Sequence, residues 1–293
     1  MLPAVFTPEL LQTLELLQIR SRRAFLGTRQ GGHVSVKRGH GIEFSDYRKY
    51  ELGDSPRHID WGVYARSDRL YVKRFQEEQD LSVLIIVDTS GSMITPAEDR
   101  KWEMGRNIAL ALGYIALMQQ DGVSFSAPGH LLTPRLSGAR AIHQLGKLVT
   151  ELQIDGSADF IGGVKQAVNA VRFPGVAIVI SDFLMPLEKI QEVFNLLRSR
   201  NLDTSAIQVL GANDVEPLKG SGDIVAVDSE TGEEVNLNLT PHEREEYAWL
   251  LEQHNKKLAE FLASSQINYT RTSADEALGD FIAQNLTRTG LVA

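Results

Sequence analysis

Apolar residues along the chain form short continuous runs that alternate with stretches of helical periodicity. Residues 81–87 and 176–180 are apolar at nearly every position and rich in β-branched side chains, which is typical of strands buried on both faces of a parallel sheet. Residues 123–127, 205–210 and 267–270 predict further strands. The alternation with helices predicts an α/β fold, a three-layer, doubly wound, mostly parallel sheet with right-handed crossovers.

The helical stretches and one hairpin complete the predicted elements. Apolar spacing of three to four residues predicts helices over residues 8–26, from a capping box at Thr95 to about 120, and over 139–152, 160–171, 188–199, 240–263 and 274–286. Alternation with period two predicts a β-hairpin insertion at about 221–240. We expect two parts: residues 1–78, a helix plus a basic, aromatic, β-containing subdomain, and residues 79–293, which hold the sheet.

Composition narrows the class of protein. The 293 residues include no cysteine, so disulfides and thiolate metal sites are excluded. The first twenty residues lack the basic start and apolar run of a signal peptide, and no apolar stretch predicts a membrane span, so we expect a cytoplasmic protein. Residues 20–75 hold 13 Lys and Arg against 6 Asp and Glu, whereas residues 76–293 hold 17 against 30. Because no nucleic-acid motif accompanies this asymmetry, we expect no nucleic-acid partner.

The first buried strand ends in Asp88, Ser90 and Ser92. These oxygen-bearing side chains occupy alternate positions around Gly91, and they can converge if the glycine lets the chain curl tightly. One carboxylate and two hydroxyls form a hard oxygen site, which suits Mg²⁺ or Mn²⁺ better than zinc. The alternative is a strand-to-helix turn in which the same side chains only cap backbone N–H groups.

The second apolar strand repeats this design, because it delivers Asp182 at its carboxyl end. In a doubly wound sheet, ligands collect beyond the carboxyl ends of the strands, at the point where the strand order reverses. If strands 82–88 and 176–180 are central neighbours, Asp88 and Asp182 meet there. A helix cap or a turn is the alternative role for Asp182.

Two segments resemble known families. Asp88-x-Ser90-x-Ser92, between a buried strand and a helix, resembles the first motif of the metal-ion-dependent adhesion site of von Willebrand factor A domains. The preceding segment is similar to the bacterial family called domain of unknown function 58 (DUF58), and the similarity continues through the strand. The residues that carry it are Glu43, Arg48-x-Tyr50, Gly53-Asp54, Arg57-x-Ile59-Asp60-Trp61 and Ala65-Arg66.

The resemblance implies a third ligand loop and a class of partner. At the corresponding place these families usually carry Gly-Thr-Asp, with the threonine as a metal ligand, but here Ala158 stands at the threonine position. Ser157 or Asp159 could take its place, or the site could bind metal weakly or not at all. Relatives are commonly associated with MoxR-type AAA+ ATPases, which implies an adaptor or chaperone role in complex assembly.

We therefore expect a non-catalytic, divalent-cation-dependent protein-interaction module that binds an Asp or Glu of a partner through Asp88, Ser90, Ser92 and Asp182. A Mg²⁺-dependent phosphohydrolase that uses Asp88 is an alternative, although such enzymes normally need a second Asp where Ser90 stands. A metal-free structural module is the second alternative. The sequence leaves open the role of residues 43–75, which are rich in arginine and aromatic side chains, and the oligomeric state.

Overall fold

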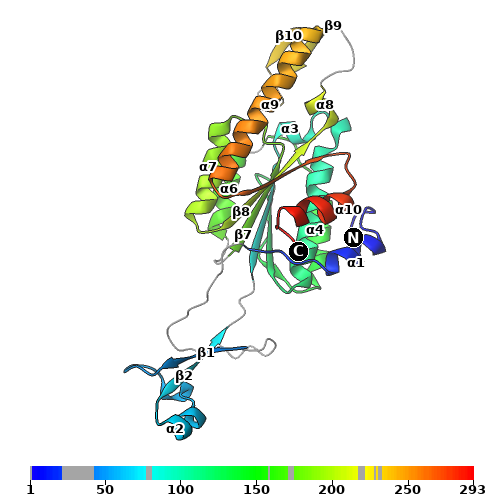
Figure 1. Ribbon diagram of the computed structural model, residues 1–293. Coiled ribbons are helices and arrows are strands. Elements are labelled where there is room, and N and C mark those ends of the chain that lie inside the picture. The colour runs from blue at the N-terminus through cyan, green and yellow to red at the C-terminus, as the bar shows by residue number, and fades with distance from the viewer. Residues whose placement is uncertain are drawn as a thin grey trace. The chain divides into compact units, whose positions relative to one another are not determined.

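The computed structural model describes residues 2–21, 43–76, 81–157, 159–170, 175–216, 222–227, 229 and 233–293 (Figure 1). The chain divides into two compact units. One consists of residues 1–23 and 81–293, and the other of residues 24–80. Ala158, the predicted glycine turn of the hairpin and the end of the predicted first helix lie outside the described residues.

The larger unit is built on a mostly parallel sheet. Its strand order is β11-β8-β7-β3-β4-β5, with β6 also paired to β4, which makes seven strands in the part of the chain that the structure describes. Strands β3, β4, β7, β8 and β11 are parallel, whereas β5 and β6 run antiparallel to β4. The strands are β3 (Ser82–Val87), β4 (Gly122–Ala127), β5 (Leu131–Leu132), β6 (Leu136–Ser137), β7 (Gly175–Ser181), β8 (Asp203–Leu210) and β11 (Asn268–Ser273).

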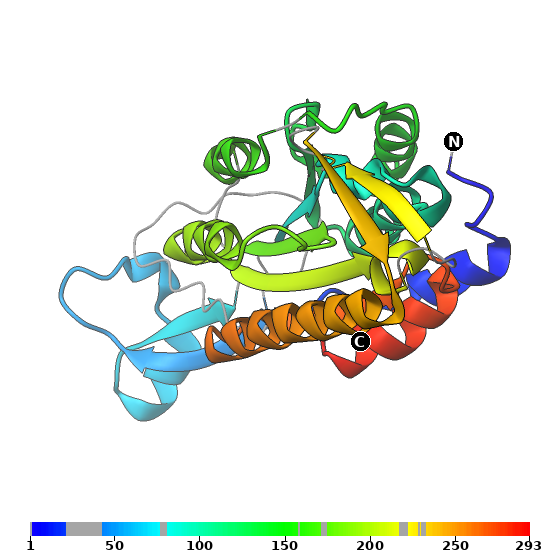
Figure 2. The same cartoon turned by 90° about the horizontal axis from the view of Figure 1, so that it is seen from above.

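Helices cover both faces of this sheet (Figure 2). One face packs against α1 (Pro8–Glu15), α4 (Lys101–Met118), α5 (Ala141–Thr150), α10 (Leu278–Asp280) and the π-helical η3 (Phe281–Leu286). The other packs against α6 (Phe160–Ala170), α7 (Leu187–Ser199) and the C-terminal half of α9 (Pro241–Ser264). Strand β3 sends Val83 and Ile85 to the first face and Leu84 and Ile86 to the second. The predicted three-layer α/β fold is confirmed.

Three predicted helix boundaries are wrong. The first helix was predicted to reach residue 26, but α1 ends at Glu15, and Ile19 pairs with Val292 in an antiparallel β-bridge. The capping box at Thr95 does not start a helix, because Arg100 has a left-handed backbone (φ 52°) and α4 begins only at Lys101. Residues 97–99 instead form the 3₁₀ turn η2 (Ala97–Asp99). The closing helical segment begins at Leu278 rather than at 274, because the preceding strand β11 extends to Ser273.

The N-terminal helix belongs to the larger unit, whereas the sequence analysis placed it with the basic subdomain. Helix α1 ends at Glu15, and its Leu14 is fully buried in the same cluster as Ile115 of α4. The Tyr114 hydroxyl donates a hydrogen bond to Glu15 at 2.9 Å. Helix α1 therefore packs on α4 through one buried apolar side chain and one hydrogen bond, and it belongs to the sheet unit.

The smaller unit pairs β1 (Glu43–Lys49) with β2 (Tyr71–Gln76) in an antiparallel ribbon, with η1 (Pro56–His58) and α2 (Trp61–Ser67) between them. Within this unit Arg48 pairs with Asp54 at 2.6 Å, and Asp60 caps α2 by accepting from the backbone N–H groups of Gly62 and Val63. Trp61 is 59% exposed.

Beyond these layers, β9 (Gly222–Val227) and β10 (Glu234–Leu239) form the predicted hairpin as a separate antiparallel ribbon before α9.

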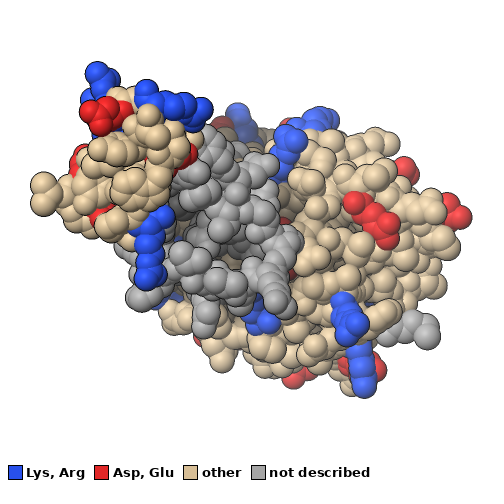
Figure 3. Space-filling model, turned by 90° about the horizontal axis from the view of Figure 1, so that it is seen from below, with Lys and Arg blue, Asp and Glu red and all other residues tan. Residues whose placement is uncertain are grey.

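On the face seen in Figure 3, Lys and Arg side chains lie scattered among acidic and uncharged ones. Within the described chain, no helix is both long enough and apolar enough to pass through a membrane.

Packing of α1 on the sheet unit can be tested by mutation. Leu14→Ala should lower the free energy of unfolding by about 2 to 5 kcal/mol, because Leu14 is 0% exposed. Leu16→Ala is the control, since Leu16 is 83% exposed and its loss should change the stability by less than about 0.5 kcal/mol. Urea denaturation of both variants measures the difference. Equal, small effects would mean that α1 is not part of this core.

Candidate functional site

Asp88 is the centre of the polar site at the carboxyl end of β3. Its side chain is fully buried. One carboxylate oxygen accepts from the backbone N–H of Ser90 at 2.9 Å, and the other accepts from the Ser181 hydroxyl at 2.6 Å. The backbone N–H of Asp88 continues the sheet by donating to Ile180 of β7 at 2.8 Å. The carboxylate therefore lies where two central strands end.

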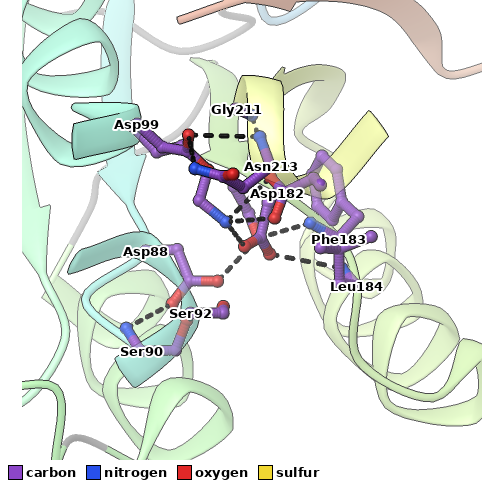
Figure 4. A network of polar contacts seen from close by, with 12 residues as sticks. Asp88, Ser90, Ser92, Asp99, Asp182, Phe183, Leu184, Gly211 and Asn213 are labelled. Atoms are coloured by element: carbon purple, nitrogen blue, oxygen red, sulfur yellow. Dashed lines mark hydrogen bonds and ion pairs between the residues drawn. The ribbon is translucent and has the colours of Figure 1, made fainter. Parts of the chain in front are cut away.

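Ser90 and Ser92 lie together, as the sequence predicts. Their hydroxyl oxygens are 3.2 Å apart, and Ser90 is buried. Ser90 precedes the short helix α3 (Gly91–Ile94), but its hydroxyl makes no capping hydrogen bond there. The alternative interpretation, in which these serines only cap a helix, does not account for Ser90. Figure 4 shows Asp88, Ser90 and Ser92 in one group.

Gly91 serves a different purpose from the predicted one. Its backbone has no positive φ, so the turn does not need glycine for the curl. Instead, a Cβ at this position would meet the carbonyl oxygen of Ser229 at 2.2 Å, and a Cβ on Gly156 would lie 2.9 Å from the Gly91 Cα. Ser229 and the 156–157 loop both approach Gly91 closely. The absence of a side chain lets three segments meet at this loop.

The third predicted loop approaches the site through its backbone. Ser157 forms an isolated β-bridge with Ser90, but its hydroxyl donates to Asp155 at 2.8 Å. Hydrogen bonds from the backbone and the hydroxyl of Ser157 lower the pKa of Asp155. Asp159 accepts from the backbone N–H of Gly162 at 2.9 Å, at the start of α6. The side chains of Ser157 and Asp159 are thus engaged away from Asp88.

Asp182 lies beside Asp88, as predicted from the adjacency of β3 and β7, and is 1% exposed. One oxygen accepts from the backbone N–H of Leu184 at 3.2 Å, which is the turn role considered in the sequence analysis. The other accepts from Lys101 Nζ at 3.0 Å, and the same ammonium lies 2.9 Å from Asp214. Lys101 itself is 1% exposed, and Figure 4 shows Asp88 and Asp182 close together.

Lys101 and Asp214 were not predicted as site residues. In the structure Lys101 is the first residue of α4, where the helix dipole disfavours a cation, but the sequence predicted the helix start at Thr95 and so hid this mismatch. Asp214 follows β8 in the short helix α8 (Ala212–Val215), just as Asp88 and Asp182 follow their own strands. Three neighbouring parallel strands therefore each lead to a buried aspartate at the same edge.

The charges in this cluster do not balance. Burial, with repulsion from Asp182 as the second cause, raises the pKa of Asp88 to about 6 from an ordinary value near 3.8. Burial by itself lowers the pKa of Lys101, but Asp182 and Asp214 outweigh it and raise that pKa, so the ammonium stays charged. Burial also raises the pKa of Asp214, although Lys101 opposes the shift. Three buried carboxyl groups therefore share one ammonium.

The residues around Asp88 fit a small divalent cation. Two neighbouring ligands of octahedral Mg²⁺ lie roughly 3.0 Å apart, and the hydroxyl oxygens of Ser90 and Ser92 are separated by 3.2 Å. The buried Asp88 carboxylate supplies a hard, charged oxygen ligand beside these hydroxyls. Among the described residues, no group of three or more His, Cys, Asp or Glu side chains is arranged to hold a metal.

Fold and site together define the class of this protein. It is a doubly wound α/β protein whose polar site lies beyond the carboxyl ends of its central strands, where the strand order reverses. The sequence matches the family described as "Protein of unknown function DUF58" over residues 46–257. The match spans more than half of the chain, and the chain belongs to this family. The predicted family resemblance is confirmed.

Relatives and solved structures are similar at low identity. "Uncharacterized protein Rv1480" of Mycobacterium tuberculosis and "Uncharacterized protein Mb1516" of Mycobacterium bovis are each 27% identical over 260 residues, covering 86% of this chain and 81% of theirs. The conserved hypothetical protein BatB of Bacteroides thetaiotaomicron is 18% identical, with a TM-score of 0.42 over 71% of this chain and 98% of its own. An aerotolerance-related membrane protein of Bacteroides fragilis is 16% identical, with a TM-score of 0.39 over 71% and 99%. These structural scores are too low to carry a functional argument.

The unbalanced charge of Asp88 leads to a test in metal-free buffer. The pKa of Asp88 is raised in the folded state. The free energy of unfolding of the protein therefore falls as the pH rises from about 4 to about 6, because the buried carboxyl must then ionise. Asp88→Asn should therefore raise the free energy of unfolding at pH 7, by about 1 to 3 kcal/mol, and the gain should vanish below about pH 4.

Urea denaturation between pH 4 and pH 8 measures this dependence. Asp280→Asn is the control, because it removes the same charge from an exposed position. A loss of stability in Asp88→Asn that is equal at all pH values would contradict the assignment of Asp88 as a buried, uncompensated charge.

Proposed function

We propose that this chain is a non-catalytic protein-interaction module that binds a carboxylate of its partner through a divalent cation, Mg²⁺ or Mn²⁺. The observation that supports it is the convergence of the buried Asp88 carboxylate with the adjacent hydroxyls of Ser90 and Ser92. Asp182 lies beside them and adds negative charge to the site. This is the arrangement that the resemblance to von Willebrand factor A domains implies.

The chemistry follows from the donor set. A cation held by one carboxylate and two neutral hydroxyls keeps much of its positive charge and several exchangeable waters. An Asp or Glu of the partner can displace a water and balance the charge. Asp88 would supply the one negative charge, while the neutral hydroxyls of Ser90 and Ser92 would orient the cation without reducing its positive charge. Binding would be reversible and dependent on metal.

The partner that the DUF58 resemblance implies is a MoxR-type AAA+ ATPase, and we propose an adaptor or chaperone role in complex assembly, in the cytoplasm. A metal-free interaction module is the second candidate. It is favoured by Lys101, which already neutralises Asp182, and by the engagement of Ser157 and Asp159 elsewhere. A phosphohydrolase gains no comparable support, because Ser90 stands where a second acid would act.

Metal binding is tested by calorimetric titration with Mn²⁺. Asp88→Ala should abolish binding, and Ser92→Ala should weaken it at least about tenfold, because each removes a direct ligand. Ser157→Ala is the matched control, since that hydroxyl points to Asp155 and its loss should leave the affinity within about twofold. Equal effects of the two serine variants, or no binding by the wild type up to millimolar Mn²⁺, would contradict the proposal.

Partner binding is tested with a purified MoxR-type ATPase from the same organism. Complex formation measured by biolayer interferometry should require Mg²⁺, disappear with EDTA and be lost in Asp88→Ala, because the bridging cation is then absent. Binding that persists in EDTA and in Asp88→Ala would favour the metal-free module instead. Release of phosphate from a generic phosphoester by the purified chain, lost in Asp88→Ala, would favour the phosphohydrolase.

A further inference from the structure

Lys101 is a buried cation next to the candidate metal site, and the proposed function does not use it. Its ammonium lies 3.0 Å from Asp182 and 2.9 Å from Asp214, and all three side chains are nearly excluded from solvent. Burial of such a group is expensive, and the N-terminus of α4 adds an unfavourable dipole. Apolar side chains in place of all three charged residues would often be as stable as the ion pairs, so stability alone does not explain why the triad is charged.

The charge balance suggests what the lysine does. With Asp88, Asp182 and Asp214 ionised and Lys101 protonated, the four side chains carry a formal charge of −2. One divalent cation neutralises that charge. Without Lys101 the charge would be −3, which attracts a dication more strongly. Lys101 also occupies the carboxylate oxygen of Asp182 that would otherwise be available to a cation beside Asp88.

We propose that Lys101 is an internal counter-cation that lowers the affinity of the Asp88 site for divalent cations and holds Asp182 outside direct coordination. This inference deepens the proposed function and rests on its site. Lys101 acts as a positioning residue, because its contacts are with Asp182 and Asp214 and not with the Asp88 carboxylate. A weakened site holds its cation exchangeably, as reversible partner binding requires.

Residues outside the 88–92 loop fix the position of Asp214 and thereby the position of Lys101. The Asp214 carboxylate accepts from the backbone N–H of Gly211 at 2.8 Å. The hydroxyl of Tyr247, in the first half of α9, donates to the backbone carbonyl of Asp214 at 2.9 Å. A change at α8 or α9 therefore alters how tightly Lys101 is drawn from Asp182 towards Asp214.

Three variants separate this role from a purely structural one. Lys101→Met removes the positive charge and frees Asp182. Asp214→Asn leaves Lys101 with Asp182 alone and makes the cluster less negative. The double variant Lys101→Met/Asp214→Asn removes one charge of each sign and keeps the formal charge at −2, which makes it the matched control. Mn²⁺ affinity is measured by calorimetry, and circular dichroism melting confirms that each variant is folded.

The expected shifts have opposite signs. Lys101→Met should bind Mn²⁺ at least about tenfold more tightly than the wild type, and Asp214→Asn at least about threefold more weakly, because each changes the charge beside the cation by one unit. The double variant keeps the wild-type charge but frees Asp182, so it should bind Mn²⁺ more tightly than the wild type and less tightly than Lys101→Met. A purely structural role would instead move both affinities in the same direction.

The outcomes also distinguish this inference from the proposed function. Wild-type binding with no tightening in Lys101→Met overturns the role of Lys101 and leaves the metal site standing. Binding only in Lys101→Met supports the role of Lys101 and overturns metal-dependent function in the natural chain. No binding in either overturns both. If Lys101→Met does not fold, Asp214→Asn decides, since unchanged or tighter binding there overturns the inference.

Discussion

The parallel packing of β3, β7 and β8 is the constraint on which the site depends. Because parallel neighbours end at the same edge of a sheet, the aspartates that follow them, Asp88, Asp182 and Asp214, gather within a small buried volume. Like charges in such a volume repel strongly unless cations compensate them. Lys101 supplies one positive charge from α4, and the remaining imbalance is greatest at Asp88.

Close backbone packing holds the rest of the site in place. Gly91 has no room for a side chain, because the Ser229 carbonyl and the Gly156 backbone both approach it. Ser229 and the 156–157 loop thus contact the same residue from which α3 begins. An incoming partner side chain must approach a loop that is already bordered by these two segments. The site is therefore shaped by parts of the chain that lie far apart in sequence.

Much of this arrangement could be predicted from the sequence, because its causes are local. Continuous apolar runs predict buried strands, and the rule for doubly wound sheets correctly places Asp182 beside Asp88. Lys101 could not be predicted, because its partners come from two other strands and only tertiary packing brings them together. The same holds for Gly91, whose role depends on the close approach of Ser229. The start of α4 was missed because the left-handed backbone of Arg100 overrides a favourable capping pattern.

Under the proposed function, a divalent cation occupies the space between Asp88, Ser90 and Ser92. Anomalous scattering from crystals grown with Mn²⁺ is the most direct test, since it locates the metal without assuming its ligands. A peak is expected roughly 2.2 Å from the Asp88 carboxylate and from both serine hydroxyls, with Lys101 still between Asp182 and Asp214. No peak at saturating Mn²⁺, or a peak away from Asp88, would contradict it.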